Sequence, residues 1–327
     1  HGIPFIFQKE RSLPSRLFWT VCLIVSTGAC AFLVLKAINS YLEYDAYDKM
    51  RVVYESQIEF PAISICNINQ FATNDSSLYI QKIRENNYVT DFVGSTSFGQ
   101  YSSQLSRAVA NYANVRFLGI LNSASTNETT RKSFGATKNQ TILSCSYQLT
   151  ECTEANFTWF YDSHYGNCYK FNAGHNTITY SKPGREDSLL LLLYVGIDDT
   201  LNSVATSLGA HLFIHNSSNI LNFNEGINVA AGTDTNVILA KMVQTYLPYP
   251  YNDCREDLNT IGSYDSILVK EILLSNHSYR QRDCRLLCFQ LELIQTCKCY
   301  DISFLQLFNA PPCTSSVQLG CVIGTYA

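Results

Sequence analysis

Residues 17–35 read LFWTVCLIVSTGACAFLVL, a run of nineteen residues without a charged side chain. An α-helix rises about 1.5 Å per residue, so this run would be about 28 Å long, close to the hydrocarbon thickness of a bilayer. The sequence therefore predicts a membrane-spanning helix. Lys36, at the end of the run, can extend its ammonium group toward the headgroups. The two cysteines inside the run, Cys22 and Cys30, are expected to be apolar fillers.

A cleavable signal peptide is the competing interpretation of this run. Signal peptides have a shorter apolar core, which is followed by a cleavage site made of small residues. Here the run is followed by Lys36 and by the bulky residues YLEY at 41–44. We therefore favour the spanning helix.

Charged residues flank the span unequally. Three basic residues precede it: Lys9, Arg11 and Arg16. Three acidic residues follow it: Glu43, Asp45 and Asp48. Because basic residues favour the cytoplasmic side of a membrane, we expect 1–16 to be cytoplasmic, 17–42 to form the transmembrane helix and 43–327 to be extracellular. The plasma membrane is the expected location.

The composition after the span is that of a folded, exported protein. Hydrophobic residues make up 46% of the chain and charged residues 15%, and the net charge of −4 argues against a nucleic-acid partner. Eleven cysteines without metal-site spacing indicate disulfides in an oxidising compartment. Six Asn-X-Ser/Thr sites agree with export: Asn74, Asn127, Asn139, Asn156, Asn216 and Asn276.

Short apolar runs bounded by Pro, Gly or Asn predict strands. They lie at 60–67, 189–195, 210–214 and 237–242. The run LLLLLYV at 189–195 is too short to cross a bilayer, so we expect it to be a buried strand. Helices are expected at 78–85, at 104–117 and around 279–293. These patterns predict an α+β fold in which a β-rich body carries helical outgrowths.

The chain has no motif of the common enzyme classes, neither HExxH, GxSxG, a P-loop nor a dinucleotide fingerprint. His211 and His215 lie four residues apart, but in a strand-like segment and without an acidic partner at ligand spacing. We therefore expect hydrogen-bonded or exposed histidines and not a metal site. The chain is expected not to be an enzyme and to need no cofactor.

Five segments carry a resemblance to a known family. They are His1-Gly2, FPAISICN at 60–67, NEGINVAAGTDTNVIL at 224–239, LPYPYNDC at 247–254 and CRLLCFQLELIQTCKC at 284–299. Their order resembles that of the degenerin and epithelial sodium channels, which include the acid-sensing channels. The resemblance covers nearly the whole chain and is weakest over 72–140.

Membership of that family would imply a trimeric, amiloride-sensitive sodium channel embedded in the lipid bilayer. Each subunit would have two membrane helices and a disulfide-rich β-core with a helical finger and thumb. The finger would be about 72–140, the thumb 254–327, and 60–71 with 141–253 mainly palm, β-ball and knuckle. The second helix, which forms the pore in this family, is expected beyond residue 327. Expected partners are two further subunits, giving a homotrimer, and sodium ions, with amiloride as pore blocker.

The resemblance also implies roles for named cysteines. Four pairs would form disulfides: Cys66–Cys168, Cys145–Cys152, Cys297–Cys321 and Cys299–Cys313. Three cysteines, Cys254, Cys284 and Cys288, are left over and would pair with a later cluster that precedes the second membrane helix. The competing interpretation is that these three pair among themselves or with another chain.

Two further implied roles concern gating. His1 and Gly2 resemble the family's gating dipeptide, which lies in a re-entrant cytoplasmic segment. Tyr44 and Tyr251 match the positions where the family places an aromatic pair that couples the extracellular domain to the pore. For Tyr44 a membrane-interface role is an equally good interpretation.

The stimulus is inferred by elimination within the family. Acid-sensing members commonly have histidine just outside the first span, where this chain has Asp45, Tyr47 and Asp48. Constitutively open epithelial members usually carry basic cleavage sites in the finger. Arg131-Lys132 is a lone dibasic pair, which we interpret as an exposed charged turn. We therefore favour a channel gated by a neuropeptide of the FMRFamide type.

A short amidated peptide with an Arg and aromatic ends needs a cleft with a carboxylate and apolar walls. The finger offers five candidates: Asp75, Glu85, Asp91, Phe92 and Phe98. A proton-gated or constitutively open channel of the same family is the alternative. A single-span adhesion or receptor ectodomain is the alternative from another class, and a second apolar span of about 20 residues would exclude it.

Overall fold

The computed structural model describes residues 3–7, 12–55, 57–85, 118–119, 122, 126–174, 178–180, 184, 186–196, 207–222, 225–252, 260–262, 265–304, 306, 309–315, 317–318, 321–322 and 325. The chain divides into two units. The helix unit comprises His1–Tyr54 with Ala240–Asp257, and the sheet unit comprises Glu55–Leu239 with Leu258–Ala327. Each is described by itself.

The helix unit is dominated by α2 (Leu13–Leu42), which follows the short α1 (Ile3–Phe7). At about 1.5 Å per residue, the thirty residues of α2 extend about 45 Å, which spans a bilayer with its headgroup regions. None of its residues is buried within the protein, as expected of a helix that faces lipid. The hydroxyl groups of Thr20 and Thr27 donate to the carbonyl oxygens of Arg16 and Leu23, at 2.8 and 2.7 Å, so they need no water.

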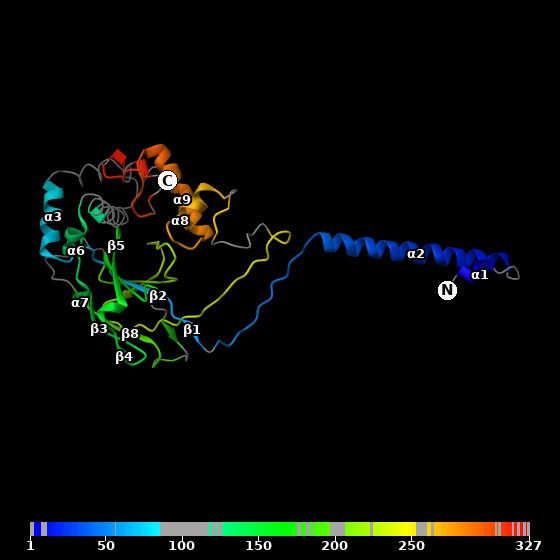
Figure 1. Cartoon of the computed structure of the whole chain (residues 1–327), viewed down its shortest axis with the longest axis horizontal. Helices are drawn as coiled ribbons and strands as arrows, with labels where there is room; N and C mark the ends of the chain where they lie inside the picture. Colours follow the sequence, from blue (N-terminus) through cyan, green and yellow to red (C-terminus); the bar gives the residue numbers. More distant parts are fainter. Residues whose placement is uncertain are drawn as a thin grey trace, which may run out of the picture. The chain divides into compact units, whose positions relative to one another are not determined.

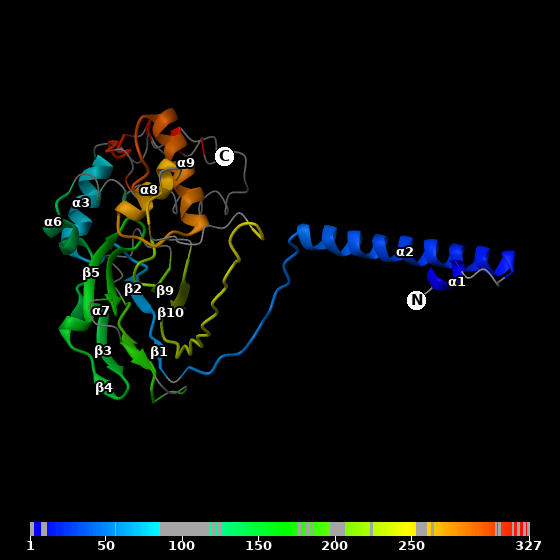
Figure 2. The same ribbon diagram turned by 45° about the vertical axis from the view of Figure 1, so that its right-hand side comes forward.

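A five-stranded sheet forms the centre of the sheet unit (Figures 1 and 2). Its order is β10 (Ile227–Ala230), β9 (Gly209–His215), β2 (Ala62–Asn67), β6 (Gly166–Phe171) and β5 (Phe157–Asp162), and every pair is antiparallel. All six residues of the central strand β2 are buried. This strand therefore has protein on both faces and a partner on both edges.

Two smaller sheets accompany it. One has the order β4 (Thr150–Glu151), β3 (Ile142–Tyr147) and β8 (Leu189–Leu193), and the other pairs β1 (Ile58–Glu59) with β7 (Thr179–Tyr180). A 3₁₀-helix, η2 (Glu154–Asn156), precedes β5. One hydrophobic core joins the five-stranded and the three-stranded sheet. Ile63, Ile65 and Phe171 pack there with Ile142 and with three leucines of β8: Leu189, Leu191 and Leu193.

The prediction of a buried strand at 189–195 is half wrong. The strand is present as β8, but its residues alternate between half-buried and exposed, with Leu190 and Leu192 in the exposed positions. β8 lies at the edge of its sheet, where only one face meets the core, so burial follows the two-residue period of a strand.

The predicted strand at 237–242 is wrong. The segment has no strand hydrogen bonding, and its apolar residues are exposed, Ile238 and Met242 most fully. A strand requires a neighbour for its backbone groups, and no strand among the described residues pairs with this segment. The predictions at 60–67 and 210–214 correspond to β2 and β9.

Helices pack beside the five-stranded sheet (Figure 1). The predicted helix at 78–85 belongs to α3 (Asn74–Glu85), while 104–117 lies outside the described residues. α3 packs with α6 (Glu128–Phe134) through a cluster that includes Phe71, Ile80 and Phe134. α7 (Lys138–Thr141) leads directly into β3. The predicted helix around 279–293 is α9 (Gln281–Cys297), which packs on α8 (Ile267–Leu274).

A row of cations covers alternate residues of β5. Lys132 Nζ lies 4.2 Å from the ring centroid of Trp159, and Lys138 Nζ lies 5.4 Å from that of Phe157. The guanidinium carbon of Arg131 is 5.4 Å from the ring centroid of Tyr161. These cation–π contacts hold α6 and the start of α7 to the sheet. Arg131-Lys132 thus belongs to a helix that packs on aromatic rings, so the predicted turn is wrong, while the Lys132 side chain is 45% exposed, as expected.

A buried ion pair holds the start of α9. Asp283 is 1% exposed and accepts two hydrogen bonds from Arg280, from Nε at 2.6 Å and from Nη2 at 2.8 Å. Arg280 Nη2 also donates to the carbonyl oxygen of Ile220, and Glu225 lies within ion-pair range of Arg280 and Arg282. This network connects α9 to the segment between β9 and β10.

Asp283→Asn should destabilise the sheet unit. The substitution keeps the size of the side chain but leaves the Arg280 guanidinium without its buried counter-charge. Because Arg280 is a quarter exposed and water screens part of its charge, we expect a loss of about 2 to 4 kcal/mol. A lower midpoint of thermal unfolding of the detergent-solubilised chain would report this loss of stability. Glu128→Gln, which breaks the exposed pair with Lys132 on α6, is the matched control and should leave the midpoint unchanged. Equal midpoints for both variants would contradict the assignment.

Candidate functional site

The end of α2 brings together two tyrosines that lie far apart in the sequence. Tyr44 follows the last helical turn with φ of 51°, and its N–H donates to the carbonyl oxygen of Tyr41 at 3.3 Å. Tyr251 belongs to a turn closed by its own N–H, which donates to Pro248 O at 3.1 Å. The two ring centroids are 5.7 Å apart and the ring planes are inclined by 84°, an edge-to-face contact. Both residues belong to the helix unit.

A cavity of about 490 Å³ that is open to solvent adjoins this pair. Its lining includes four tyrosines, from α2, from the segment that follows it and from the turn at 248–251: Tyr41, Tyr44, Tyr47 and Tyr251. Asp45 supplies a carboxylate, and Ser40 and Ala37 complete the wall on the helix. The cavity therefore combines aromatic surface with one negative charge.

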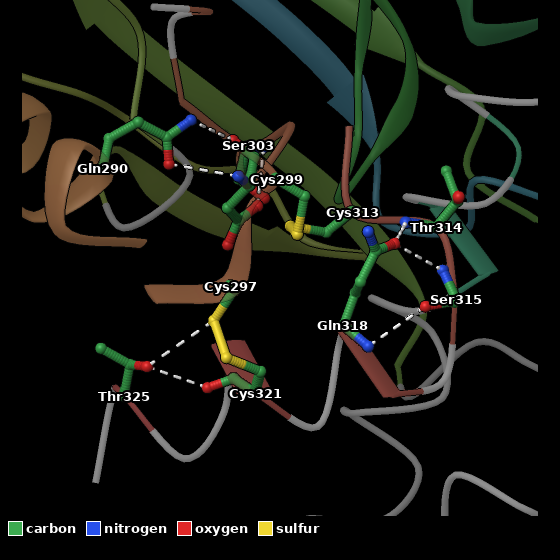
Figure 3. Close-up of a disulfide and its surroundings, with 11 residues drawn as sticks. Gln290, Cys297, Cys299, Ser303, Cys313, Thr314, Ser315, Gln318, Cys321 and Thr325 are labelled. Atoms are coloured by element: carbon green, nitrogen blue, oxygen red, sulfur yellow. Dashed lines mark hydrogen bonds between the residues drawn. A yellow bond between two sulfur atoms is a disulfide. The ribbon is translucent and has the colours of Figure 1, made fainter. Parts of the chain in front are cut away.

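The structure joins the same four cysteine pairs that the resemblance implies. Cys66–Cys168 links β2 to β6 at directly opposed positions, and Cys145–Cys152 links β3 to the residue after β4. Cys297–Cys321 and Cys299–Cys313 tie the end of α9 to the segment that follows it (Figure 3). Each closed loop contributes about 2 to 4 kcal/mol of stability.

Side-chain hydrogen bonds reinforce the two disulfides after α9. Gln290, which is fully buried, donates to the carbonyl oxygen of Asp301 at 3.0 Å and accepts from the Asp301 N–H at 3.1 Å. Gln318 Oε1 accepts from the N–H groups of Thr314 and Ser315, at 3.1 and 3.2 Å. Figure 3 shows Gln290 and Gln318 on either side of the Cys299–Cys313 bridge. The backbone of this cysteine-rich segment is thus held at several points.

The two histidines of β9 are hydrogen-bonded side chains. His215 Nδ1 donates to Asn216 O at 2.7 Å, and its Nε2 accepts from the buried Ser64 hydroxyl at 3.0 Å. Burial, together with the nearby cations Lys170 and Arg280, lowers its pKa to about 4 against the opposing effect of the hydrogen bond to Asn216.

His211 has the second hydrogen-bonded ring. It stacks on Tyr165 at 4.3 Å, its Nε2 donates to Glu225 O at 2.7 Å, and its Nδ1 lies 2.6 Å from Asn228 Oδ1. Burial lowers the pKa of His211, an effect that Asn228 and Asp162 oppose. The described residues contain no group of His, Cys, Asp and Glu that could hold a metal ion.

Comparison with known proteins identifies the family. The family model described as amiloride-sensitive sodium channel matches residues 1–325. The chain belongs to the amiloride-sensitive sodium channel family. This is the degenerin and epithelial sodium channel group, and the resemblance drawn from the five sequence segments is confirmed. The family consists of ion channels, so the expectation that the chain is not an enzyme is confirmed as well.

Relatives from three branches match the chain. The FMRFamide-activated amiloride-sensitive sodium channel of Cornu aspersum is 24% identical over 329 residues, covering 96% of this chain and 48% of its own length. Acid-sensing ion channel 1C of Danio rerio is 26% identical over 319 residues, covering 91% and 56%. The epithelial sodium channel subunit alpha of Anolis carolinensis is 30% identical over 239 residues, covering 71% and 34%. The chain spans about half the length of the curated relatives it matches.

The family resemblance also predicts roles for five further residues, and the structure describes only two of them. His1, Gly2 and Cys254 lie outside the described residues. Cys284 and Cys288 lie one turn apart on α9, half-buried and exposed, and neither holds a disulfide within the part of the chain that the structure describes. Their roles, and the family's gating dipeptide, stay predictions.

The two candidate peptide residues that the structure describes lie apart. Asp75 lies in the first turn of α3 and Glu85 is its last residue, so about 15 Å of helix separates them. Glu85 accepts a hydrogen bond from Gln81 at 3.0 Å. The remaining three, Asp91, Phe92 and Phe98, lie outside the described residues. The two described carboxylates therefore cannot share one peptide cation, and the expectation of a common cleft is not supported for them.

The six predicted glycosylation sites lie at the surface of the sheet unit. Asn156 is half-buried, and five are exposed: Asn74, Asn127, Asn139, Asn216 and Asn276. Sequence reasoning did not find Asp283 or the cation row of β5. The signal for Asp283 was present, since a carboxylate in the first turn of an apolar helix, three residues after an Arg, favours an ion pair.

Acid should destabilise the sheet unit through His215. In the folded state its pKa is about 4, while the ordinary value is 6.5, so the unfolded chain takes up a proton that the folded chain does not. The contribution of neutral His215 to the free energy of unfolding is fully present above about pH 6.5, and it is lost as the pH decreases toward 4. His215→Gln, whose amide can bond Ser64 and Asn216 without titrating, should give a shallower fall. Unfolding midpoints between pH 7 and 4 measure the slope, and equal slopes would contradict this role.

Proposed function

We propose that this chain is a subunit of a trimeric, amiloride-sensitive sodium channel of the plasma membrane, opened by an extracellular amidated peptide of the FMRFamide type. The observation that carries the proposal is the family match over residues 1–325, together with a peptide-activated relative that covers 96% of this chain. In this assignment residues 1–16 are cytoplasmic and the sheet unit is extracellular, which agrees with the surface position of all six sequons and with the disulfides.

The disulfides support a role for the sheet unit in transmitting force. Four bridges and a central strand buried on both faces make this unit resist deformation. A stiff body passes on a displacement produced by a bound ligand, whereas a soft one absorbs it. We propose that peptide binding moves segments of the sheet unit and that this motion reaches the membrane helix.

The segment 240–257 offers the covalent route for this motion. It leaves the sheet unit after Leu239 and returns to it at Leu258, and it carries Tyr251 near its middle. Tyr251 contacts Tyr44 at the end of α2, with ring centroids 5.7 Å apart. We propose that this aromatic pair couples the ligand-binding body to the membrane helix, and that His1 and Gly2 act in gating.

Proton gating is the alternative that the relatives keep open, since an acid-sensing channel covers 91% of this chain. Three histidines with a lowered pKa argue against a histidine-based proton switch. Burial lowers the pKa of His211, His215 and His277, so none of them gains its proton more readily than a free histidine. A switch that responds to mild acid needs a group that titrates near neutral pH.

We propose further that three cysteines form disulfides with a later part of the channel, which corresponds to the part of the relatives outside the match. They are Cys254, Cys284 and Cys288. The exposed position of Cys288 and the half-buried position of Cys284, on one side of α9, leave both sulfurs within reach of another segment. Mass-spectrometric mapping of the disulfides in protein from the complete gene distinguishes this pairing from bridges among the three.

Current recording tests the proposed function. The complete gene product in oocytes should give sodium current on application of FMRFamide-type amidated peptides, and amiloride should block it. Solutions at pH 6 to 5 without peptide should evoke little current. Current evoked by acid and not by peptide would replace the peptide-gated assignment with a proton-gated one. A steady amiloride-blocked current without stimulus would indicate a constitutively open channel.

Tyr251→Ala should weaken coupling in these recordings. An aromatic contact contributes roughly 0.5 to 1.5 kcal/mol beyond area burial, so its loss should shift the peptide concentration for half-maximal current by about three- to tenfold. Tyr246→Ala is the control, because Tyr246 lies in the same segment but does not line the cavity. Surface labelling of both variants checks delivery to the membrane. A concentration–response curve for Tyr251→Ala that matches wild type would contradict the coupling role.

A further inference from the structure

Strand β8 has the composition of an interior strand, but it lies at the edge of its sheet. Its five residues are all leucine, and Leu190 and Leu192, on the outward face, are 56% and 59% exposed. Among the described residues only β3 pairs with it. A strand that is apolar on both faces is typical of a buried position. Proteins protect exposed edges with charged residues or Pro, and β8 contains neither, so this edge needs a cover.

The outward face beside this edge carries an apolar patch. Leu190 lies directly opposite Ser146 and Leu192 opposite Ser144, so only short side chains stand next to the leucines in the middle of the sheet. Single exposed apolar side chains are ordinary, whereas adjoining ones mark an interaction surface. The patch consists of four large apolar residues, each more than half exposed: Leu143, Leu190, Leu192 and Tyr194.

A second segment of the chain lacks a neighbour in the same way. Residues 237–243 read VILAKMV, a composition typical of a strand. Every one of these residues is exposed, Ile238 most fully, and the segment has no strand hydrogen bonding among the described residues. Its first three residues, 237–239, belong to the sheet unit, as β8 does.

We propose that 237–243 of one subunit adds to the β8 edge of the next subunit, as a fourth strand of its three-stranded sheet. This inference rests on the proposed trimer. Three identical subunits close a ring only through contacts between two different surfaces, so β8 cannot make these contacts by pairing with itself. Strand addition at a sheet edge gives both partners the main-chain hydrogen bonds that they lack. Each of the two segments thus gains its neighbour from the other.

The side chains of the added strand would meet apolar surface on both faces of β8. Successive residues of a strand point to opposite faces. Those on the outward face would lie beside Leu190 and Leu192. Those on the inward face would lie beside the other leucines of β8, which pack on the core but stay half-buried. A segment that is apolar at consecutive positions, as 237–240 is, suits both faces.

Charge favours the same pairing. Glu151 lies opposite Ser146 on the outward face, and β3, β4 and β8 contain no basic residue. Asp187 comes two residues before β8. The charged residue within 237–243 is Lys241. The contact therefore joins a basic segment to an acidic sheet, whereas β8 pairing with itself would bring two acidic sheets together.

Disulfide trapping between differently tagged chains tests the pairing. The complete gene product is expressed as two versions in the same cells, one with Leu192→Cys and one with Ile238→Cys, each with its own epitope tag. Leu190→Cys, one strand repeat along β8, replaces Leu192→Cys in a parallel sample. Because a disulfide requires Cα atoms about 4.4 to 6.8 Å apart, a doubly tagged product forms only where the two segments adjoin in different subunits. We expect one combination to give about fivefold more doubly tagged, reduction-sensitive product than the controls.

Two matched controls replace one partner at a time. Leu78→Cys, at a leucine of α3 that is 58% exposed, replaces the β8 variant. Val52→Cys, at an exposed apolar residue of the helix unit, replaces Ile238→Cys. Equal yields from a control combination, or a disulfide between two Leu192→Cys chains, would overturn the pairing.

Native gel electrophoresis of the same samples separates this inference from the proposed trimer. Trimers that give no doubly tagged product with either β8 variant would contradict the pairing and leave the trimer standing. Chains that run as monomers would contradict the trimer and the pairing together.

Discussion

The burial of β2 on both faces and both edges is the constraint on which the sheet unit depends. Its six residues lie between β6 and β9, and Cys66 is bonded to Cys168 across the first of these pairs. Because water does not reach the strand, its polar groups need partners inside the protein. Ser64 donates to His215, and Asn67 Oδ1 accepts from the Asn69 N–H at 2.9 Å. The neutral state of His215 is therefore a consequence of the same burial that holds the sheet together.

Charged side chains attach the helices to this core from outside. Lys132 and Arg131 reach aromatic rings of β5, and Arg280 reaches the buried Asp283 and the carbonyl oxygen of Ile220. In both places the cation keeps part of its surface in water, which lowers the cost of desolvation. The apolar core gives the sheet unit its stability, and these contacts determine where each helix lies on it.

The sequence predicts best those helices and strands whose length and apolar pattern lie within one continuous segment. The apolar run at 17–35 lies in α2, and the runs at 60–67 and 210–214 form strands, because length and periodicity are local properties. The segment 237–242 has the composition of a strand but lacks a neighbour, and composition cannot supply one. The pair Tyr44–Tyr251 came from a family resemblance, since 207 positions in sequence separate the two rings. The cavity beside it depends on the same distant contact. The Arg280–Asp283 pair is local, but its links to Ile220 and Glu225 join residues about 60 positions apart, and they were not predicted.

The aromatic pair at the end of α2 combines two opposing energies of similar size. The left-handed conformation of Tyr44 costs about 1 to 3 kcal/mol, and its edge-to-face contact with Tyr251 contributes roughly 0.5 to 1.5 kcal/mol beyond area burial. Because these energies are of similar size, the states with and without the ring pair would differ little in free energy. A bias of about 1.4 kcal/mol changes their ratio tenfold, which is within the range that a bound ligand or a displaced loop supplies. A tightly packed pair would resist such a bias, so the strain at Tyr44 supports the proposed coupling role.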